Sequence, residues 1–240
     1  MSSRRVRVVQ VVCDLTKKPI SELSILDLAA SEGQFSFEFA SRGAQVTGIE
    51  GRQSNIEKAL TLGEKLKLPV TFIKDDVRNL SAQRYGNFDV VLSLGILYHL
   101  DGPDILPFLK AIYELCRDFV IVDTHVALRP EERFGEYWGW YFSEPSEEGH
   151  PRASLGNTRS FWLTKPSLVN ALADAGFTSV MEVHFPTMND IPADRVTVVG
   201  FKGQAEPPSV VFTDPKILEE RMPEAPVVIS LQQPVRTQSA

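Results

Sequence analysis

The sequence contains few of the residues that build disulfide frameworks or metal sites. Its 240 residues include only 2 cysteines and 4 histidines. The thiols of Cys13 and Cys116 are too few for a disulfide framework, and free thiols are typical of a reducing compartment. Asp123 and His125 are possible metal ligands, but no third ligand is obvious beside them. We therefore expect a cytoplasmic protein without a metal site.

Long hydrophobic runs and positive charge are also scarce. No apolar stretch reaches the length of about 18 residues that indicates a membrane span, and the N-terminus lacks the hydrophobic segment of a signal peptide. The formal net charge is −6 and the isoelectric point is about 5.3. The short basic start, Arg4 to Arg7, is expected to be solvated. These features predict no membrane segment and disfavour nucleic acid as a partner.

The sequence does contain a strand–turn–helix pattern followed by a second strand. Residues 24–30 form a short apolar run interrupted by Asp27, and small residues lead from it to Gly33. A helical pattern follows, and the next apolar run ends at Glu50. Helix N-termini and turn amides attract anionic groups, and an acid at the tip of the second strand suits ribose hydroxyls. This βαβ unit therefore predicts a nucleotide-type cofactor.

The rest of the chain continues to alternate between apolar strands and amphipathic helices. This alternation predicts a doubly wound α/β sheet, whose ligands bind at the carboxyl ends of the strands. Residues 5–15 are rich in valine and fit either a strand or a helix. The pattern Ser54-Asn-Ile-Glu57 is typical of a capping box at the start of a helix.

Composition divides the chain into several parts. Residues 1–20 form an N-terminal segment, and residues 21–203 carry the α/β domain. Residues 127–162 interrupt that domain with an insertion rich in aromatics, acids, glycine and proline. The tail, residues 204–240, has prolines spaced along it that rule out a continuous element. We expect the tail to be an extended or partly disordered appendage.

The motifs at the strand ends resemble those of class I S-adenosylmethionine-dependent methyltransferases. The first motif of that family places an acid before a glycine turn, and the subgroup reading L-D-L-G-C-S-E-G is similar to Asp27-Leu-Ala-Ala-Ser-Glu-Gly33. Glu50, the pair Asp76-Val77 and the segment from Ser93 to Leu100 resemble later motifs in the same order. The resemblance covers residues 25–201. It implies a mostly parallel seven-stranded Rossmann-like sheet with an antiparallel final strand.

The resemblance also implies the cofactor, which would be S-adenosyl-L-methionine. The residues expected to contact it are Asp27, Ala29, Ser31, Gly33, Glu50, Asp76, Val77 and Ser93. Ala29 and Ser31 stand where members of the family commonly have glycine. Their small side chains still allow a ligand to approach the backbone closely if φ is negative there.

Two histidines follow strands that end at the expected site. His99 comes after the central apolar run, and His125 comes after the next one. Imidazole titrates near neutrality, so either residue could act as a general base. A structural hydrogen bond is the alternative role for each. Both remain candidate catalytic residues.

The aromatic insertion supplies candidates for a substrate site. Its aromatic side chains could form a lid that excludes water and binds an organic molecule. A local aromatic core beneath a long loop is the structural alternative. An arginine beside these side chains could clamp a substrate carboxylate. The candidate substrate residues are Tyr98, Trp138, Tyr141, Arg159 and Trp162.

The favoured function is methyl transfer to an oxygen or nitrogen of a small organic molecule by in-line displacement. A tRNA- or nucleotide-modifying methyltransferase is one alternative, because sequences like that around His99 occur in such families. A non-catalytic binding module is another, in which Ala29 and Ser31 would block the cofactor cavity. A nicotinamide oxidoreductase is disfavoured because the chain lacks a G-x-G-x-x-G motif.

Overall fold

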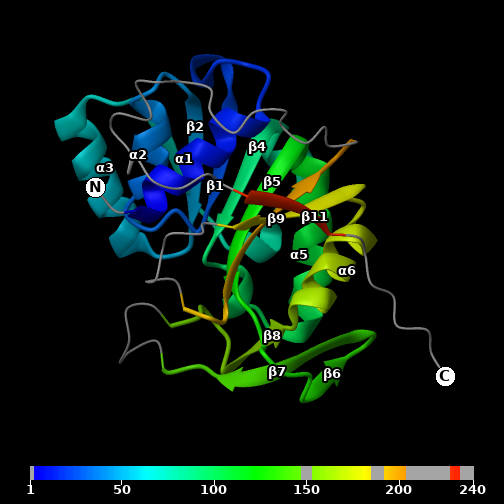
Figure 1. Cartoon of the computed structure of the whole chain (residues 1–240). Helices are drawn as coiled ribbons and strands as arrows, with labels where there is room; N and C mark the ends of the chain where they lie inside the picture. Colours follow the sequence, from blue (N-terminus) through cyan, green and yellow to red (C-terminus); the bar gives the residue numbers. More distant parts are fainter. Residues whose placement is uncertain (1–2, 147–152, 185–191, 204–227, 233–240) are drawn as a thin grey trace.

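An eight-stranded sheet forms the centre of the protein (Figure 1). This computed structural model describes residues 3–146, 153–184, 192–203 and 228–232. The strands of the sheet are β1 (Ser24–Leu28), β2 (Gln45–Glu50), β3 (Val70–Lys74), β4 (Phe88–Leu94), β5 (Cys116–His125), β9 (Ser179–His184), β10 (Arg195–Phe201) and β11 (Val228–Gln232). Their spatial order is β11-β9-β10-β5-β4-β1-β2-β3.

The direction of the strands confirms the predicted fold class. Strands β1 to β5 pair in parallel with one another. Strand β10 runs antiparallel to both β5 and β9. These seven strands are the mostly parallel sheet with an antiparallel final strand that the sequence predicts. Strand β11 adds an eighth by pairing antiparallel with β9, so this part of the predicted tail extends the sheet, while residues 204–227 and 233–240 lie outside the described residues.

Six α-helices and three short 3-10 helices occur in the described ranges. They are α1 (Ser3–Leu15), η1 (Ile20–Glu22), α2 (Gln34–Ala40), α3 (Gln53–Leu66), η2 (Val77–Asn79), α4 (Ala82–Tyr85), η3 (Leu97–His99), α5 (Gly102–Leu115) and α6 (Lys165–Ala175). The valine-rich start is therefore a helix. The predicted capping box is wrong, because α3 begins at Gln53 after Arg52 and Ser54 lies inside the helix. None of these described helices has the length and apolar content needed to cross a membrane.

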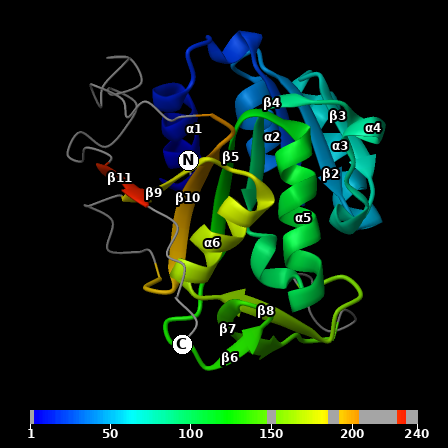
Figure 2. The same cartoon turned by 90° about the vertical axis from the view of Figure 1, so that its right-hand side faces the viewer.

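The helices cover both faces of the sheet, as Figure 2 shows. Helices α1 and α2 share one buried cluster with Val90 and Leu92 of β4. Helices α5 and α6 share the other cluster with Val91 of the same strand. Successive side chains of a strand point to opposite faces, so burial on both sides accounts for the largely apolar sequence of β4.

The aromatic insertion folds into a second, three-stranded sheet near the carboxyl ends of β4 and β5 (Figures 1 and 2). Its strands are β6 (Glu132–Phe134), β7 (Tyr137–Ser143) and β8 (Arg159–Leu163), in the order β6-β7-β8. The amide of Phe161 donates to the carbonyl of Leu100 at 2.9 Å, which ties β8 to the segment after β4. The insertion is thus attached beside the end of the sheet where a ligand would bind.

Candidate functional site

A cavity of about 410 Å³ opens at the carboxyl ends of β1, β2, β3 and β4. These strands flank the point where the strand order reverses between β1 and β4, which is where ligands bind in doubly wound sheets. The predicted site residues that line the cavity are Asp27, Ala29, Ser31, Glu50, Asp76, Val77, Tyr98 and His99. The predicted residues that are not among its lining residues are Gly33, Ser93, His125, Trp138, Tyr141, Arg159 and Trp162.

The turn after β1 has an unusual backbone. The φ angles of Ala29, Ser31 and Gly33 are 52°, 53° and 80°, all in the left-handed region that L-residues rarely adopt. The condition of a negative φ at Ala29 and Ser31 is therefore not met. The cavity is nevertheless open beside both side chains. A Cβ atom on Gly33 would lie 2.6 Å from the ring of Phe72, so only glycine fits at that position.

Asp27 lies in β1, just before this turn, and is buried, with only 2% of the residue exposed. Ser36 Oγ donates a hydrogen bond of 2.6 Å to Asp27 Oδ2. Burial raises the pKa of Asp27 from 3.8 to about 6, and the hydrogen bonds from Ser36 and the charge of Arg4 oppose that rise. Because a buried anion is costly without a cation beside it, this carboxylate suits the ammonium of an amino-acid ligand.

Glu50 is held by three donors at the end of β2. Its Oε2 accepts from the amide of Ser31 at 2.8 Å, and its Oε1 accepts from the amide of Arg52 at 2.8 Å. Asn55 Nδ2 donates to the same Oε1 at 3.2 Å. These bonds fix the carboxylate between the turn after β1 and the start of α3. Glu50 is therefore a rigid acceptor, as binding of ribose hydroxyls requires.

The two acids after β3 both have protein partners. Asp76 accepts from the amide and from Nε of Arg78, each at 2.9 Å. Asp75 pairs with Arg84 at 2.6 Å and accepts from Asn79 at 3.0 Å. The side chain of Asp76 is 34% exposed and that of Asp75 is 10% exposed. Both residues line the cavity, so Asp75 stands beside the predicted cofactor residue Asp76 in the site.

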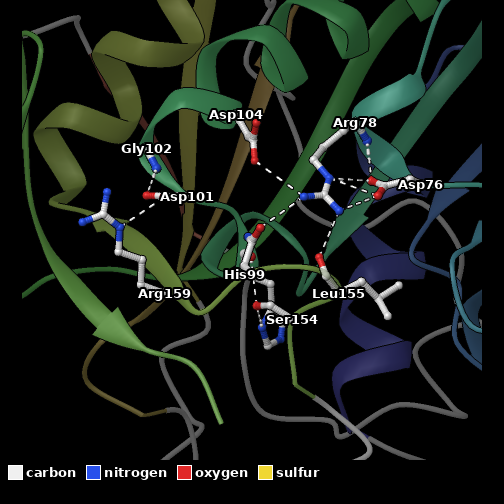
Figure 3. A network of polar contacts seen from close by, with 10 residues as sticks. Asp76, Arg78, His99, Asp101, Gly102, Asp104, Ser154, Leu155 and Arg159 are labelled. Atoms are coloured by element: carbon white, nitrogen blue, oxygen red, sulfur yellow. Dashed lines mark hydrogen bonds and ion pairs between the residues drawn. The ribbon is translucent and has the colours of Figure 1, made fainter. Parts of the chain in front are cut away.

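Residues 153–157, which we call the strap, contribute Ala153, Ser154 and Leu155 to the lining of the cavity, and Figure 3 shows Ser154 and Leu155 near Arg78 and His99. Arg78 Nη2 donates to the carbonyl of Leu155 at 3.0 Å, and Arg78 Nη1 donates to Asn157 at 3.1 Å. Arg52 Nη2 donates to the carbonyl of Ala153 at 2.6 Å. Arginines next to the cavity acids thus hold the strap in place.

His99 lines the cavity and its protonation follows from its contacts. Its Nδ1 lies 3.1 Å from Ser154 Oγ and 3.3 Å from Glu144 Oε1. Ser154 Oγ donates its own proton to the carbonyl of His99 (Figure 3), and a carboxylate only accepts, so the network assigns the ring proton to Nδ1. Burial lowers the pKa of His99, and the charge of Glu144 opposes that effect. The basic lone pair is therefore on Nε2.

His125 uses both ring nitrogens in contacts within the protein. Nδ1 lies 3.0 Å from Asp194 Oδ2, and Nε2 lies 3.1 Å from Arg195 Nη1. An arginine only donates, so Nε2 accepts from it and its lone pair is occupied. Trp162 stacks on the ring with centroids 5.1 Å apart. Of the two candidate bases, His99 has the more suitable geometry.

The aromatic candidates form layers beside the cavity. Trp162 stacks between His125 and Phe142, with ring centroids 5.1 Å and 5.0 Å away. Tyr98 is the member of this group that reaches the cavity, and its ring lies 5.9 Å from that of Trp162. The layers therefore support the cavity wall more than they line it.

Three further predicted residues are not among the lining residues of the cavity: two have partners elsewhere, and the hydroxyl of the third has none among the described residues. Arg159 lies over the ring of Tyr141 at 4.3 Å and bonds to Asp101 at 3.2 Å (Figure 3). Trp138 lies beneath Arg133 at 5.1 Å. Ser93 is fully buried in β4, and its hydroxyl has no hydrogen-bond partner among the described residues.

The structure adds three site residues that the sequence motifs did not indicate. Arg4 and Arg195 line the cavity, and Glu144 contacts His99. Arg4 was expected to be solvated, but it bonds to Asp123 at 2.8 Å and its side chain is 31% exposed. No local pattern marks these residues, because each lies far along the chain from the motif that it meets. No group of three metal-ligating side chains occurs in the described ranges.

Known sequences match the chain over part of its length. A family profile described as a methyltransferase domain matches residues 25–118. The ubiquinone biosynthesis O-methyltransferase of Rickettsia felis is 32% identical over 83 residues, which are 35% of this chain and 33% of the relative. The protein of the same name from Proteus mirabilis is 29% identical over 114 residues, 48% of this chain and 44% of the relative. The matched stretch thus spans less than half the length of these relatives.

Solved structures match over most of the chain. The N-terminal domain of EvdMO1 with SAH bound is 26% identical, with a TM-score of 0.70 over 84% of this chain and 82% of that one. The magnesium protoporphyrin IX methyltransferase of Synechocystis with bound SAH is 16% identical, with a TM-score of 0.59 and 83% of each chain covered. The second likeness concerns the fold alone.

Proposed function

We propose that the chain is a class I S-adenosylmethionine-dependent methyltransferase, in keeping with the methyltransferase-domain profile that matches residues 25–118, and that it transfers a methyl group from S-adenosylmethionine to an oxygen of a small organic molecule. One observation carries this proposal: two buried acids, Asp27 and Glu50, line the same cavity as His99, whose Nε2 has no hydrogen-bond partner among the described residues. Both relatives from Rickettsia felis and Proteus mirabilis are named as O-methyltransferases, which supports oxygen over nitrogen as the acceptor atom.

The residues present fit the cofactor. When bound, the cofactor supplies a methyl group on a positively charged sulfur. Asp27 would bind its ammonium group, since a buried carboxylate lacks water to solvate it. Glu50 would accept hydrogen bonds from the ribose hydroxyls. Val77, which is 8% exposed and lines the cavity, would pack against the adenine.

His99 would remove the proton of the acceptor. A hydroxyl acceptor is protonated at neutral pH, so a base in the cavity speeds its attack on the methyl carbon. The Nδ1 proton of His99 is directed at Ser154 and Glu144, which leaves Nε2 to accept the proton. Glu144 then stabilises the imidazolium that forms, because its side chain is 2% exposed and carries the opposite charge.

The open cavity supports an enzyme over a non-catalytic module. Blockage of the cofactor site by Ala29 and Ser31 would favour a binding module. The cavity of about 410 Å³ beside both residues argues against that alternative. The net charge of −6 continues to disfavour a tRNA substrate.

Isothermal titration calorimetry with S-adenosylhomocysteine tests the cofactor assignment. We expect saturable binding by the purified protein, and an absence of heat at high protein concentration would overturn the proposal. Glu50→Ala should weaken binding by about tenfold or more, because a buried hydrogen-bonding partner is lost. Glu57→Ala, on the exposed side of α3, is the matched control and should bind as the wild type does.

Glu50 also holds two backbone amides, so its replacement affects stability as well as binding. Loss of their acceptor costs about 1–3 kcal/mol for each donor left unsatisfied. The free energy of unfolding of Glu50→Ala should therefore be measured without ligand in the same buffer. A folded variant with unchanged affinity would contradict the role of Glu50.

A further inference from the structure

Two arginines share one carboxylate at the edge of the cavity. Asp123 Oδ1 accepts from Arg4 Nη2 and from Arg195 Nε, each at 2.8 Å. Asp123 is 6% exposed, and although burial alone would raise its pKa, Arg4 and Arg195 hold that pKa below its usual value. The carboxylate is therefore ionised. Asp123 alone cannot neutralise two guanidinium groups, so an excess of positive charge remains beside it, although Arg4 also acts on the buried carboxyl group of Asp27.

The excess charge lies beside Gly95, just after β4. A Cβ atom built on Gly95 would be 3.4 Å from Arg4 Nη2, 3.6 Å from Arg195 Nη2 and 3.8 Å from the hydroxyl of Tyr98. All four residues line the cavity. Two guanidinium nitrogens and a hydroxyl thus surround the space beside Gly95, which has no side chain to fill it. Such a set of donors matches a carboxylate, which needs several donors and a positive charge.

The arginines keep part of their hydrogen-bonding capacity. Arg195 has five N–H groups, of which three point to Asp123 and His125. The Nε of Arg4 is buried and has no hydrogen-bond partner among the described residues. Unsatisfied donors in a partly buried, positively charged place are costly without an anion.

We propose that Arg195, together with the hydroxyl of Tyr98, binds a carboxylate group of the methyl acceptor. This assignment rests on the proposed function and narrows the substrate class to small organic acids that carry a hydroxyl group. Arg4 contributes the second positive charge, which prevents Asp123 from neutralising Arg195 completely.

We assign the bound carboxylate to the methyl acceptor and not to the cofactor, because Arg195 lies on the side of the aromatic layers. Arg4 packs over Phe35 at 5.4 Å and acts on the pKa of Asp27, so it lies toward the turn that holds the cofactor. Arg195 lies 5.9 Å from the ring of Tyr98 and contacts His125. Those residues belong to the aromatic layers, so Arg195 lies between the cofactor turn and the aromatic sheet.

Arg195 also fits the role better than Arg159, the arginine that the sequence indicated. The side chain of Arg159 is 55% exposed and that of Arg195 is 18% exposed. Arg159 bonds to Asp101 and is not among the cavity residues. An ion pair with an exposed side chain is weakened by water, whereas a partly buried pair is stronger.

The test compares an acid with its neutral amide in the full-length protein saturated with S-adenosylhomocysteine. Calorimetry would measure the binding of 3,4-dihydroxybenzoate and of 3,4-dihydroxybenzamide. We expect the acid to bind about tenfold to a hundredfold more tightly than the amide. Arg195→Gln should abolish this preference while the affinity for S-adenosylhomocysteine stays within about twofold. Arg117→Gln, at the exposed and opposite end of β5, should keep the preference.

Several results would overturn the inference. They are equal affinity for acid and amide in the wild type, no binding of the acid, or loss of the preference in Arg159→Gln instead of Arg195→Gln. An equal loss of S-adenosylhomocysteine affinity in Arg195→Gln would also overturn it, because the carboxylate would then belong to the cofactor. If Arg195→Gln does not fold, Arg195→Lys is the second test. This variant keeps the positive charge and should lower the preference for the acid over the amide at least threefold. An unchanged preference would refute the role of Arg195.

The proposed function and the acceptor assignment can be refuted separately. A wild-type protein that does not bind S-adenosylhomocysteine contradicts the proposed function. A protein that binds S-adenosylhomocysteine but does not prefer the acid contradicts the acceptor assignment alone.

Discussion

Replacing Asp27 by asparagine should make the ligand-free protein more stable and a weaker binder of its cofactor. Asp27 is 2% exposed, and asparagine keeps both its shape and an acceptor for the 2.6 Å hydrogen bond from Ser36. The substitution therefore removes mainly the cost of a buried charge. Active sites commonly sacrifice stability for function in this way.

The size of the effect follows from the pKa of Asp27. A carboxyl group with a pKa of 3.8 in the unfolded chain and about 6 in the folded protein corresponds to about 3 kcal/mol. Below pH 3.8 both states are protonated and there is no penalty. As the pH rises from 3.8 to about 6, the unfolded state ionises first, so the stability of the wild type falls. Above pH 6 the penalty is constant.

Urea denaturation followed by circular dichroism between pH 4.5 and pH 8 measures this effect. Asp27→Asn should exceed the wild type by up to about 3 kcal/mol at pH 7.5, and by about 1 kcal/mol at pH 4.5. A variant that is less stable than the wild type at pH 7.5, or a difference that grows toward low pH, would refute the reasoning.

A second buried aspartate provides a control of opposite sign. Burial raises the pKa of Asp89, but hydrogen bonds from Lys18 and Ser24 outweigh it and lower the pKa to about 2. Its ionised form therefore stabilises the fold, and the stabilisation is lost as the pH falls toward 2. Asp89→Asn should accordingly reduce stability at neutral pH.

The same Asp27→Asn variant should bind S-adenosylhomocysteine at least about tenfold more weakly at pH 7.5, because an amide does not neutralise an ammonium group. In the wild type, affinity should rise between pH 5 and pH 7.5 as Asp27 loses its proton. Equal affinity of variant and wild type would separate Asp27 from the cofactor.

The remaining predictions concern the turn, the base and the strap. Ser31→Gly should raise the free energy of unfolding by about 0.5–1 kcal/mol in urea denaturation, because glycine adopts the φ of 53° without strain; a decrease would contradict this. Glu144→Gln should move the acidic limb of the kcat/KM profile to lower pH, since Glu144 raises the pKa of His99; a move to higher pH would refute the pairing. Gly51→Ala would place a Cβ atom 2.3 Å from Leu155 Cδ1 and force that side chain of the strap to move. Leu155 lines the cavity, so stopped-flow should show severalfold faster release of S-adenosylhomocysteine, and a wild-type rate would argue against the strap as a cover.

The parts of the site that could be predicted from the sequence are those carried by single strands and the turns after them. Asp27 interrupts an apolar strand, and Glu50 ends the next one; both line the cavity as expected. Parallel strands bring their carboxyl ends to one edge of the sheet, so strand positions alone are enough to group these acids. The alternation of helices and strands likewise predicts the doubly wound sheet.

Backbone conformation and side-chain partners followed less well from the sequence. The left-handed φ of Ala29 and Ser31 departs from the intrinsic preference of those residues and is maintained by the surrounding fold. The amide of Ser31, for example, is held by Glu50. The capping-box prediction at Ser54 was wrong because α3 already begins at Gln53, and its N-cap residue Arg52 makes no capping bond with its side chain.

Amino-acid order alone thus determined the fold class and the acids at the tips of β1 and β2, because apolar periodicity and strand ends are local properties. Only the tertiary structure decided which groups complete the cavity. Arg4 meets Asp123 across 119 residues, Arg195 meets it across 72, and Glu144 meets His99 across 45. Contacts over such separations depend on how the elements pack, and no local pattern in the chain encodes them.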